Sequence, residues 1–387
     1  MRAKQAADEE DLVELEDEVL EQDIEDEKSL DADEEPVVQY ERMQRELVTQ
    51  ALDFDLSSLA QRVENETIDL NPRYQRRTRW ARQRQSRLIE SFLMNVPVPP
   101  IYLAEDKYGQ YSVIDGQQRL RAIHDFFNGV YALTGLKVFP ELNGRRLREL
   151  PPDIRKILEV RPSLRCIVIL KQSSPDIKFD VFDRLNTGGV SLNQQEIRNN
   201  AYRGRLNDLI LELSELRLFR RMLKIKNERT SATVKHMRDC ELVLRFFALR
   251  KAWKPFKGSM RRTLNKYMED NQYAGDAKVT RLRDLFVATL KAVDAAFGDK
   301  AFVRWGPEAK QWSRGVVAGL YDAEMLACVG KDPATLVRKR PFILRQLQEA
   351  FEDAEFDDAV RTGTNQPSKL RLRVQRVQSI IDQAIGD

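Results

Sequence analysis

The sequence has few histidines, few cysteines and no long apolar run. Among its 387 residues are two histidines, His124 and His236, and three widely spaced cysteines. No Cys-x-x-Cys, His-Glu-x-x-His or P-loop spacing occurs, so zinc sites, His-Asn-His nucleases, Ser-His-Asp hydrolases and Walker-type nucleotide sites are unsupported. An apolar run of ~20 residues, which a membrane helix needs, is also missing. The acidic N-terminus and the isolated thiols favour a cytoplasmic protein with no secretory signal and no membrane contact.

Charge is abundant but unevenly distributed. Residues 1–40 hold 17 acidic and 3 basic side chains, a net charge of −14, which leaves 61 basic and 44 acidic side chains elsewhere, a net charge of +17. A basic body favours a polyanionic partner such as DNA. We expect residues 1–45 to form a disordered acidic tail, and the alternative is a tail that competes with nucleic acid for the basic surface.

Apolar periodicity predicts a mixed α+β domain over residues 46–204 and a basic, helical domain without strands over residues 205–387. The predicted helices cover residues 55–60, 84–95, 116–128, 152–160, 176–185, 192–203 and 236–251. The predicted strands cover residues 68–72, 101–103, 111–114 and 164–170. Asp55 is expected to cap the first of these helices.

The most informative segment is Asp115-Gly116-Gln117-Gln118-Arg119. An alternating strand pattern ends at an acid and a glycine, and a helical pattern starts at once. The N-terminus of a helix presents unpaired N–H groups and a partial positive charge, which suits an anion. Asp115 is expected to cap the helix, Gly116 to let a phosphate approach the backbone, and Arg119 to bind that phosphate. The alternative is that Asp115 is only a cap and Arg119 extends into solvent.

A second cluster lies between Asn71 and Trp80, just before a predicted helix. Its basic, polar and aromatic side chains suit contact with phosphates and stacking on bases. The candidate ligand-binding residues are Arg73, Gln75 and Arg76. The alternative is a basic surface loop anchored by its aromatic side chains.

A third cluster runs from Asp183 to Asn200. The helix predicted over 192–203, with a capping box of Ser191 and Gln194, carries few apolar and many amide side chains. This composition is unusual for a surface helix and indicates the polar wall of a pocket, next to a glycine turn that lets backbone amides approach a ligand. The alternative is an asparagine-rich surface helix.

Together, the ordered motifs resemble the N-terminal domain of GmrSD-type, modification-dependent restriction endonucleases. The resemblance covers roughly residues 55–250 and rests on six segments, at 71–80, 86–91, 98–102, 113–120, 185–189 and 195–199. It implies a ParB/sulfiredoxin-like fold, and a DGQQR motif associated with nucleotide binding and hydrolysis. Members of this family in GmrSD and in phosphorothioate-sensing SspE proteins serve phage defence by recognising modified DNA.

The resemblance implies an NTP-binding and NTP-hydrolysing sensor module that acts on DNA, including modified DNA. Its catalytic residues would be Asp115, Gln117, Gln118 and Arg119, with Asp115 also orienting Mg²⁺. The implied nucleotide-binding residues are Arg73, Gln75, Arg76, Gly116, Asn186, Thr187, Gly188, Glu196, Arg198 and Asn199.

The chain departs from full restriction enzymes in one respect. These enzymes add a His-Asn-His nuclease domain, whereas residues 255–387 contain no histidine. We therefore expect no DNA cleavage by this chain alone. Either a separate nuclease or defence partner protein cuts the DNA, or this protein uses the nucleotide for another purpose. Two further hypotheses remain: a non-enzymatic DNA-binding or regulatory module, and a ParB-like switch that binds CTP without catalysis.

Overall fold

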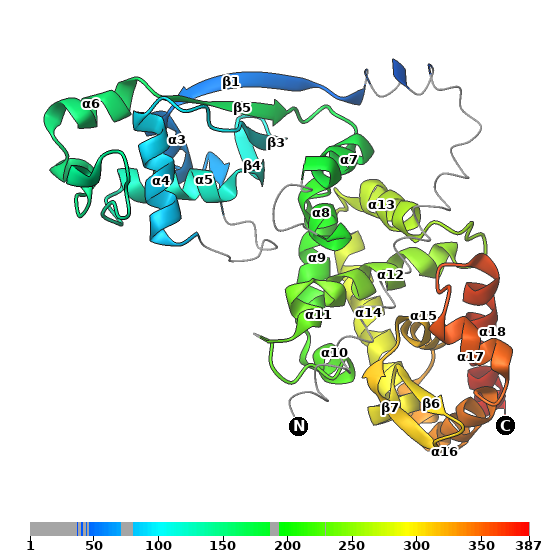
Figure 1. Cartoon of the computed structure of the whole chain (residues 1–387). Helices are drawn as coiled ribbons and strands as arrows, with labels where there is room; N and C mark the ends of the chain where they lie inside the picture. The colour runs from blue at the N-terminus through cyan, green and yellow to red at the C-terminus, as the bar shows by residue number, and fades with distance from the viewer. Residues whose placement is uncertain are drawn as a thin grey trace. The chain divides into compact units, whose positions relative to one another are not determined.

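The computed structural model describes residues 46–70, 80–185, 193–228 and 230–386, together with positions 37, 40, 41 and 44. The described chain divides into two compact units, one within residues 35–201 and the other within residues 202–387 (Figure 1). The division falls between Ala201 and Tyr202.

The first unit is built on a five-stranded mixed sheet with the order β1-β5-β3-β4-β2. Strands β1 and β5 pair antiparallel, as do β3 and β4, whereas β3–β5 and β2–β4 are parallel pairs. The strands are β1 (Thr49–Asp55), β2 (Ile68–Asp69), β3 (Ile101–Lys107), β4 (Gln110–Asp115) and β5 (Ser163–Ile169). This sheet with its helices confirms the predicted α+β class, and the likeness to ParB and sulfiredoxin stays a prediction.

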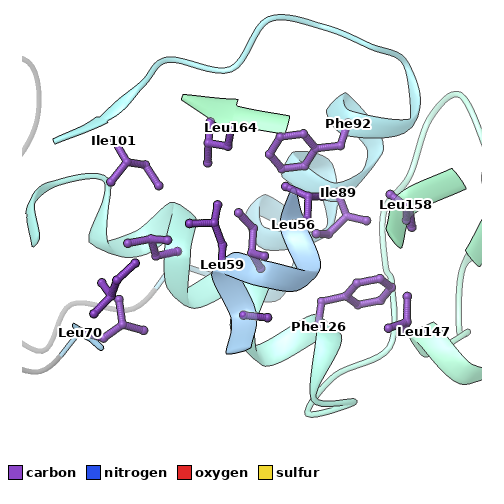
Figure 2. Packing of buried hydrophobic residues seen from close by; sticks show 14 of the residues in the cluster. Leu56, Leu59, Leu70, Ile89, Phe92, Ile101, Phe126, Leu147, Leu158 and Leu164 are labelled. Atoms are coloured by element: carbon purple, nitrogen blue, oxygen red, sulfur yellow. The ribbon is translucent and has the colours of Figure 1, made fainter. Parts of the chain in front are cut away.

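The hydrophobic core of this unit lies between the sheet and four helices. These helices are α3 (Leu56–Glu64), α4 (Arg82–Leu93), α5 (Gln117–Phe127) and α6 (Pro152–Val160). Their apolar faces meet inward-facing strand residues, and Figure 2 shows Leu56, Ile89, Phe126 and Leu158 among the buried side chains. Each helix is amphipathic, so burial of one face against the sheet stabilises it. Two short 3₁₀ turns, η1 (Pro140–Leu142) and η2 (Leu147–Glu149), precede α6, and α7 (Pro175–Leu185) and α8 (Gln194–Ala201) complete the unit.

Most of the predicted elements in this unit are confirmed. Asp55 caps α3 as expected, because its Oδ1 accepts a hydrogen bond from the Ser58 amide at 2.7 Å. Strand β1 was not predicted. Only Leu52 and Phe54 of its apolar side chains pack against the core, and the first three residues of the strand are exposed. The alternation is therefore too short to show a strand at the edge of the sheet.

The start of α8 corrects the prediction of a helix over residues 192–203. The helix begins at Gln194 and ends at Ala201. Asn193 Oδ1 accepts from the Glu196 amide at 2.9 Å, and Glu196 Oε2 accepts from the Asn193 amide at 2.8 Å. This is a capping box with Asn193 as its first member, whereas the sequence predicts Ser191 in that place. Ser191 itself lies outside the described residues.

The second unit is mainly helical, as expected, but it also holds a hairpin that contradicts the prediction of no strand after residue 205. Strands β6 (Val303–Gly306) and β7 (Gln311–Val316) pair antiparallel, with Trp305 opposite Trp312. The helices are α9 (Arg205–Ser214), α10 (Arg217–Met222), α11 (Ala232–Lys235), α12 (Arg238–Ala252), α13 (Met260–Asn271), α14 (Asp276–Phe297), α15 (Ala318–Ala327), α16 (Pro333–Ala350), α17 (Ala354–Arg361) and α18 (Pro367–Gly386), with a 3₁₀ turn η4 at Gly298–Lys300. The two strands are short and lie beside a Gly-Pro turn, so alternation alone did not reveal them.

The core of the second unit contains buried charges as well as aromatic rings. Arg245 and Arg373 both bind the Asp322 carboxylate, with Arg245 Nη2 at 2.5 Å and Arg373 Nη2 at 3.0 Å from Oδ2. All three side chains are buried. Burial lowers the pKa of the Arg373 guanidinium to about 10. Two buried guanidinium groups therefore share the Asp322 carboxylate, and Arg245 Nη1 also lies 4.0 Å from Glu241 Oε1.

None of the helices in the described ranges is long and apolar enough to cross a membrane. The three cysteines, Cys166, Cys240 and Cys328, are all buried and form no disulfide. Burial raises the pKa of each of these thiols, in Cys166 to about 12.

Candidate functional site

The junction of β4 and α5 places the DGQQR motif at the N-terminus of a helix. Gly116 is the N-cap residue, with a left-handed φ of 96°. A Cβ atom there would lie 2.9 Å from Ile101 Cγ1, so both the backbone conformation and the space require glycine. No side chain caps α5, which corrects the expectation that Asp115 does so.

Asp115 instead pairs with Arg119 one turn later. Arg119 Nη2 lies 2.6 Å from Asp115 Oδ2, and the Asp115 side chain is 45 % exposed whereas that of Arg119 is 13 % exposed. Arg119 Nη1 also donates to the carbonyl oxygens of Pro99 and Pro100, the latter at 3.1 Å. The alternative in which Arg119 extends into solvent is therefore wrong. The guanidinium joins the start of α5 to the extended segment that leads into β3.

The two glutamines of the motif bind main-chain atoms on the two sides of the second sequence cluster. Gln117 Nε2 donates to the Leu70 carbonyl oxygen at 2.5 Å, and Gln118 Oε1 accepts from the Trp80 amide at 3.1 Å. Leu70 is part of the buried core, and the Arg84 guanidinium lies 4.2 Å from the centroid of the Trp80 ring. Successive residues of α5 thus fix the chain immediately before residue 71 and immediately after residue 79.

The α8 residues predicted to bind nucleotide are buried, not exposed on a surface helix. Glu196 and Asn199 are fully buried, and Arg198 is nearly so. Gln195 Nε2 donates to Asn199 Oδ1 at 2.9 Å, and the Arg198 guanidinium lies 6.0 Å from the centroid of the Phe179 ring in α7. Glu196 closes the capping box described above. The asparagine-rich surface helix is thus excluded, and the amide-rich face forms an internal polar network.

The structure therefore brings the predicted residues together in two groups. Asp115, Gly116, Gln117, Gln118 and Arg119 form one group at the start of α5. Glu196, Arg198 and Asn199 form the other on α8, and the contacts just described do not reach Asp115. Six predicted ligand-binding residues lie outside the described residues, namely Arg73, Gln75, Arg76, Asn186, Thr187 and Gly188.

Asp106 is a titratable residue that the sequence analysis missed. It lies in β3, and its carboxyl accepts from the Ser112 hydroxyl at 3.3 Å. Burial raises the pKa of Asp106 to about 7, and the lowering effects of the Ser112 hydrogen bond and of the Lys178 charge do not offset burial. Burial also lowers the pKa of Lys178, in α7. The sequence does not indicate that Asp106 is buried, because an acidic residue next to a Lys-Tyr-Gly turn in a charged hairpin is usually exposed.

The residues at the start of α5 fit a magnesium–nucleotide complex better than a bare metal ion. The described parts of the chain contain no group of three or more His, Cys, Asp and Glu side chains that could hold a metal. Mg²⁺ bound to a nucleotide needs only one or two carboxylates, since phosphates and waters supply the other ligands. Asp115, with its exposed carboxylate beside the positive end of α5, meets that requirement.

Comparison with known proteins agrees with the motif order. Residues 56–203 match the family model described as GmrSD restriction endonuclease, N-terminal domain. The match starts at the first residue of α3 and ends two residues after α8, so it includes both groups of candidate residues. No curated protein and no solved structure matches the chain. The segment from residue 56 to residue 203 therefore belongs to the family of GmrSD restriction endonuclease N-terminal domains.

Proposed function

We propose that this chain is a nucleotide-binding, NTP-hydrolysing sensor module that acts on DNA in restriction-type antiphage defence. The observation that carries the proposal is the Asp115–Arg119 pair at the left-handed turn that opens α5, within the segment that matches the restriction endonuclease family. A helix N-terminus with a glycine turn suits phosphate oxygens, and the adjacent carboxylate suits a magnesium ion or an attacking water.

In this proposal each residue of the motif has its own role. The amides at the start of α5 bind phosphate, and the Asp115 carboxylate orients the water or holds Mg²⁺, which when bound neutralises phosphate charge. Arg119 holds the Asp115 carboxylate and adds positive charge beside the phosphates. Gln117 and Gln118 act as positioning residues, because their side chains bind Leu70 and Trp80. Arg73, Gln75 and Arg76 are proposed from the sequence alone as further phosphate contacts.

The test is phosphate release from ATP, GTP, CTP and UTP by the full chain with Mg²⁺. We expect Asp115→Asn to lower turnover of the preferred nucleotide at least ~100-fold, in line with typical losses of a water-orienting carboxylate. The matched control is Asp53→Asn, because Asp53 also forms an exposed Asp–Arg pair in the same unit, with Arg165 Nη2 at 3.0 Å. Equal turnover in Asp115→Asn and Asp53→Asn would contradict the catalytic role of Asp115.

A second candidate is a switch that binds nucleotide without hydrolysis. One observation favours it: the Arg119 guanidinium already donates hydrogen bonds to Pro99, Pro100 and Asp115. An arginine engaged in this way joins chain segments and need not stabilise a transition state. Nucleotide binding by calorimetry together with no phosphate release from any of the four nucleotides would establish the switch. A nuclease partner and a DNA target belong to both candidates.

A further inference from the structure

The β6–β7 hairpin forms a two-stranded sheet of its own within the second unit (Figure 1). Trp305 and Trp312 face each other across the two strands, with ring centroids 5.3 Å apart and an interplanar angle of 63°. Both rings are partly exposed. Large aromatic side chains on a narrow ribbon offer apolar contact area to a partner as well as to each other.

The root of the ribbon is fixed to the helices of its unit. Phe302, just before β6, is buried with a left-handed φ of 65°, a rare conformation for a bulky residue. Its amide donates to Glu324 Oε2 in α15 at 2.8 Å, and its carbonyl accepts from the Val317 amide after β7 at 2.9 Å. Arg304 forms a bidentate pair with Asp357 in α17. The ribbon is therefore held rigidly at its base, which lowers the entropy lost when it binds a partner.

The tip and one strand of the ribbon carry exposed positive charge. Lys310 closes the turn between the strands with a φ of 47°, and Arg314 lies in β7 two residues after Trp312. Both are exposed. Residues 303–316 contain three basic side chains and one acidic side chain, and the chain outside residues 1–40 has a net charge of +17. The charge of the ribbon therefore complements a polyanion.

We propose that the β6–β7 ribbon enters the major groove of duplex DNA, with Lys310 and Arg314 on phosphates and the tryptophan pair against base edges. The major groove of B-DNA admits a two-stranded ribbon, and base edges there offer apolar contacts. Lysine and arginine on phosphates set the register of such an element. This inference rests on the proposed function, because it names the element through which a protein that acts on DNA would bind DNA.

The test is fluorescence anisotropy of a labelled duplex of about 25 base pairs with the full chain, without nucleotide, at several salt concentrations. We expect Lys310→Ala/Arg314→Ala to weaken binding about tenfold and to reduce the log–log salt slope by about 1.8, the value for two phosphate contacts. The matched control is Lys251→Ala/Lys257→Ala, which removes two exposed charges of the same unit far from the ribbon in sequence. We expect the control to weaken binding less than about twofold.

A second pair of variants separates contact from folding. Trp312→Phe keeps an aromatic cross-strand pair and is expected to bind within about threefold of the unchanged chain, whereas Trp312→Ala is expected to match the loss of the double variant. Equal losses in the ribbon and control variants would overturn the proposal, as would no duplex binding by the unchanged chain. Tighter binding to a single strand of the same sequence would overturn the major-groove placement. Because nucleotide is absent, failure of NTP hydrolysis leaves these readouts unaffected.

Discussion

At the scale of the residue, the two glutamines of the motif have opposite hydrogen-bonding roles. Gln117 donates through its amide nitrogen to the Leu70 carbonyl, and Gln118 accepts through its amide oxygen from the Trp80 N–H. Adjacent residues of one type thus recognise two different main-chain groups. Replacing glutamine by glutamate keeps the side-chain oxygen that accepts and removes the amide that donates. This substitution should therefore affect Gln117 and Gln118 differently.

We expect Gln118→Glu to retain the Trp80 contact and to remain close to the unchanged chain in stability. Gln117→Glu, in contrast, brings a carboxylate against the Leu70 carbonyl oxygen and loses about 1–3 kcal/mol of unfolding free energy, because neither oxygen can donate. Urea unfolding of both variants, with phosphate release as the second readout, measures this difference. If both substitutions are tolerated alike, the glutamines do not position the chain in this way.

At the scale of the element, the junction between β4 and α5 depends on a single glycine. The strand must turn into the helix within one residue, and the left-handed φ of Gly116 achieves this while Ile101 lies against it. Gly144 provides a comparison, because its φ of 81° is also left-handed but no atom lies within 4 Å of where its Cβ would be. The two positions therefore differ mainly in the space available.

We expect Gly116→Ala to destabilise the first unit by about 1–3 kcal/mol more than Gly144→Ala, since both variants strain the backbone but only Gly116→Ala forces Ile101 to move. Thermal unfolding followed by circular dichroism gives the two shifts. Equal shifts in melting temperature would show that backbone strain alone limits the junction. Gly116→Ala is also expected to lower nucleotide binding, because the α5 amides move with the turn.

Helices and central strands were predictable in the first unit because their apolar faces meet one core. The prediction of 152–160 as a helix matches α6, and the hairpin of β3 and β4 follows from its alternation and its Lys-Tyr-Gly turn. The failures share a different cause. Strand β1 at the sheet edge and the Trp305–Trp312 ribbon bury little, so their pattern is weak. In the site, the DGQQR motif was predictable from the sequence. The hydrogen bonds of Arg119 to Pro99 and Pro100 were not, because they form only when the fold brings the segment before β3 next to the start of α5.

At the scale of the whole molecule, the two units differ in how their cores are built. The first unit has an apolar cluster and, separately, buried polar side chains on α8, whereas the core of the second unit encloses the pairing of Arg245 and Arg373 with Asp322. Charges buried in this way are hydrogen-bonded to one another, and removing the Asp322 carboxylate takes away the closest acid of both buried guanidinium groups. Stability of the second unit should therefore depend on one carboxylate, which links α12, α15 and α18.

We expect Asp322→Asn, which keeps the shape of the side chain, to lower the unfolding free energy of the second unit by about 3–5 kcal/mol. Hydrogen exchange should show faster exchange in peptides from α12, α15 and α18, with peptides from β3, β4 and β5 as the internal control. Asp53→Asn, at an exposed ion pair, is expected to leave the unfolding free energy nearly unchanged. Faster exchange in the sheet as well would contradict the division into two units.

The burial of all three thiols has a practical consequence for labelling chemistry. A thiolate, not a thiol, reacts with maleimides, and the raised pKa of Cys166, Cys240 and Cys328 keeps these side chains protonated as well as enclosed. A cysteine introduced at an exposed position, such as Ser313 in β7, becomes the single reactive site in an otherwise native chain. Fluorophores or spin labels can then be attached at chosen pairs of positions without first removing any native cysteine.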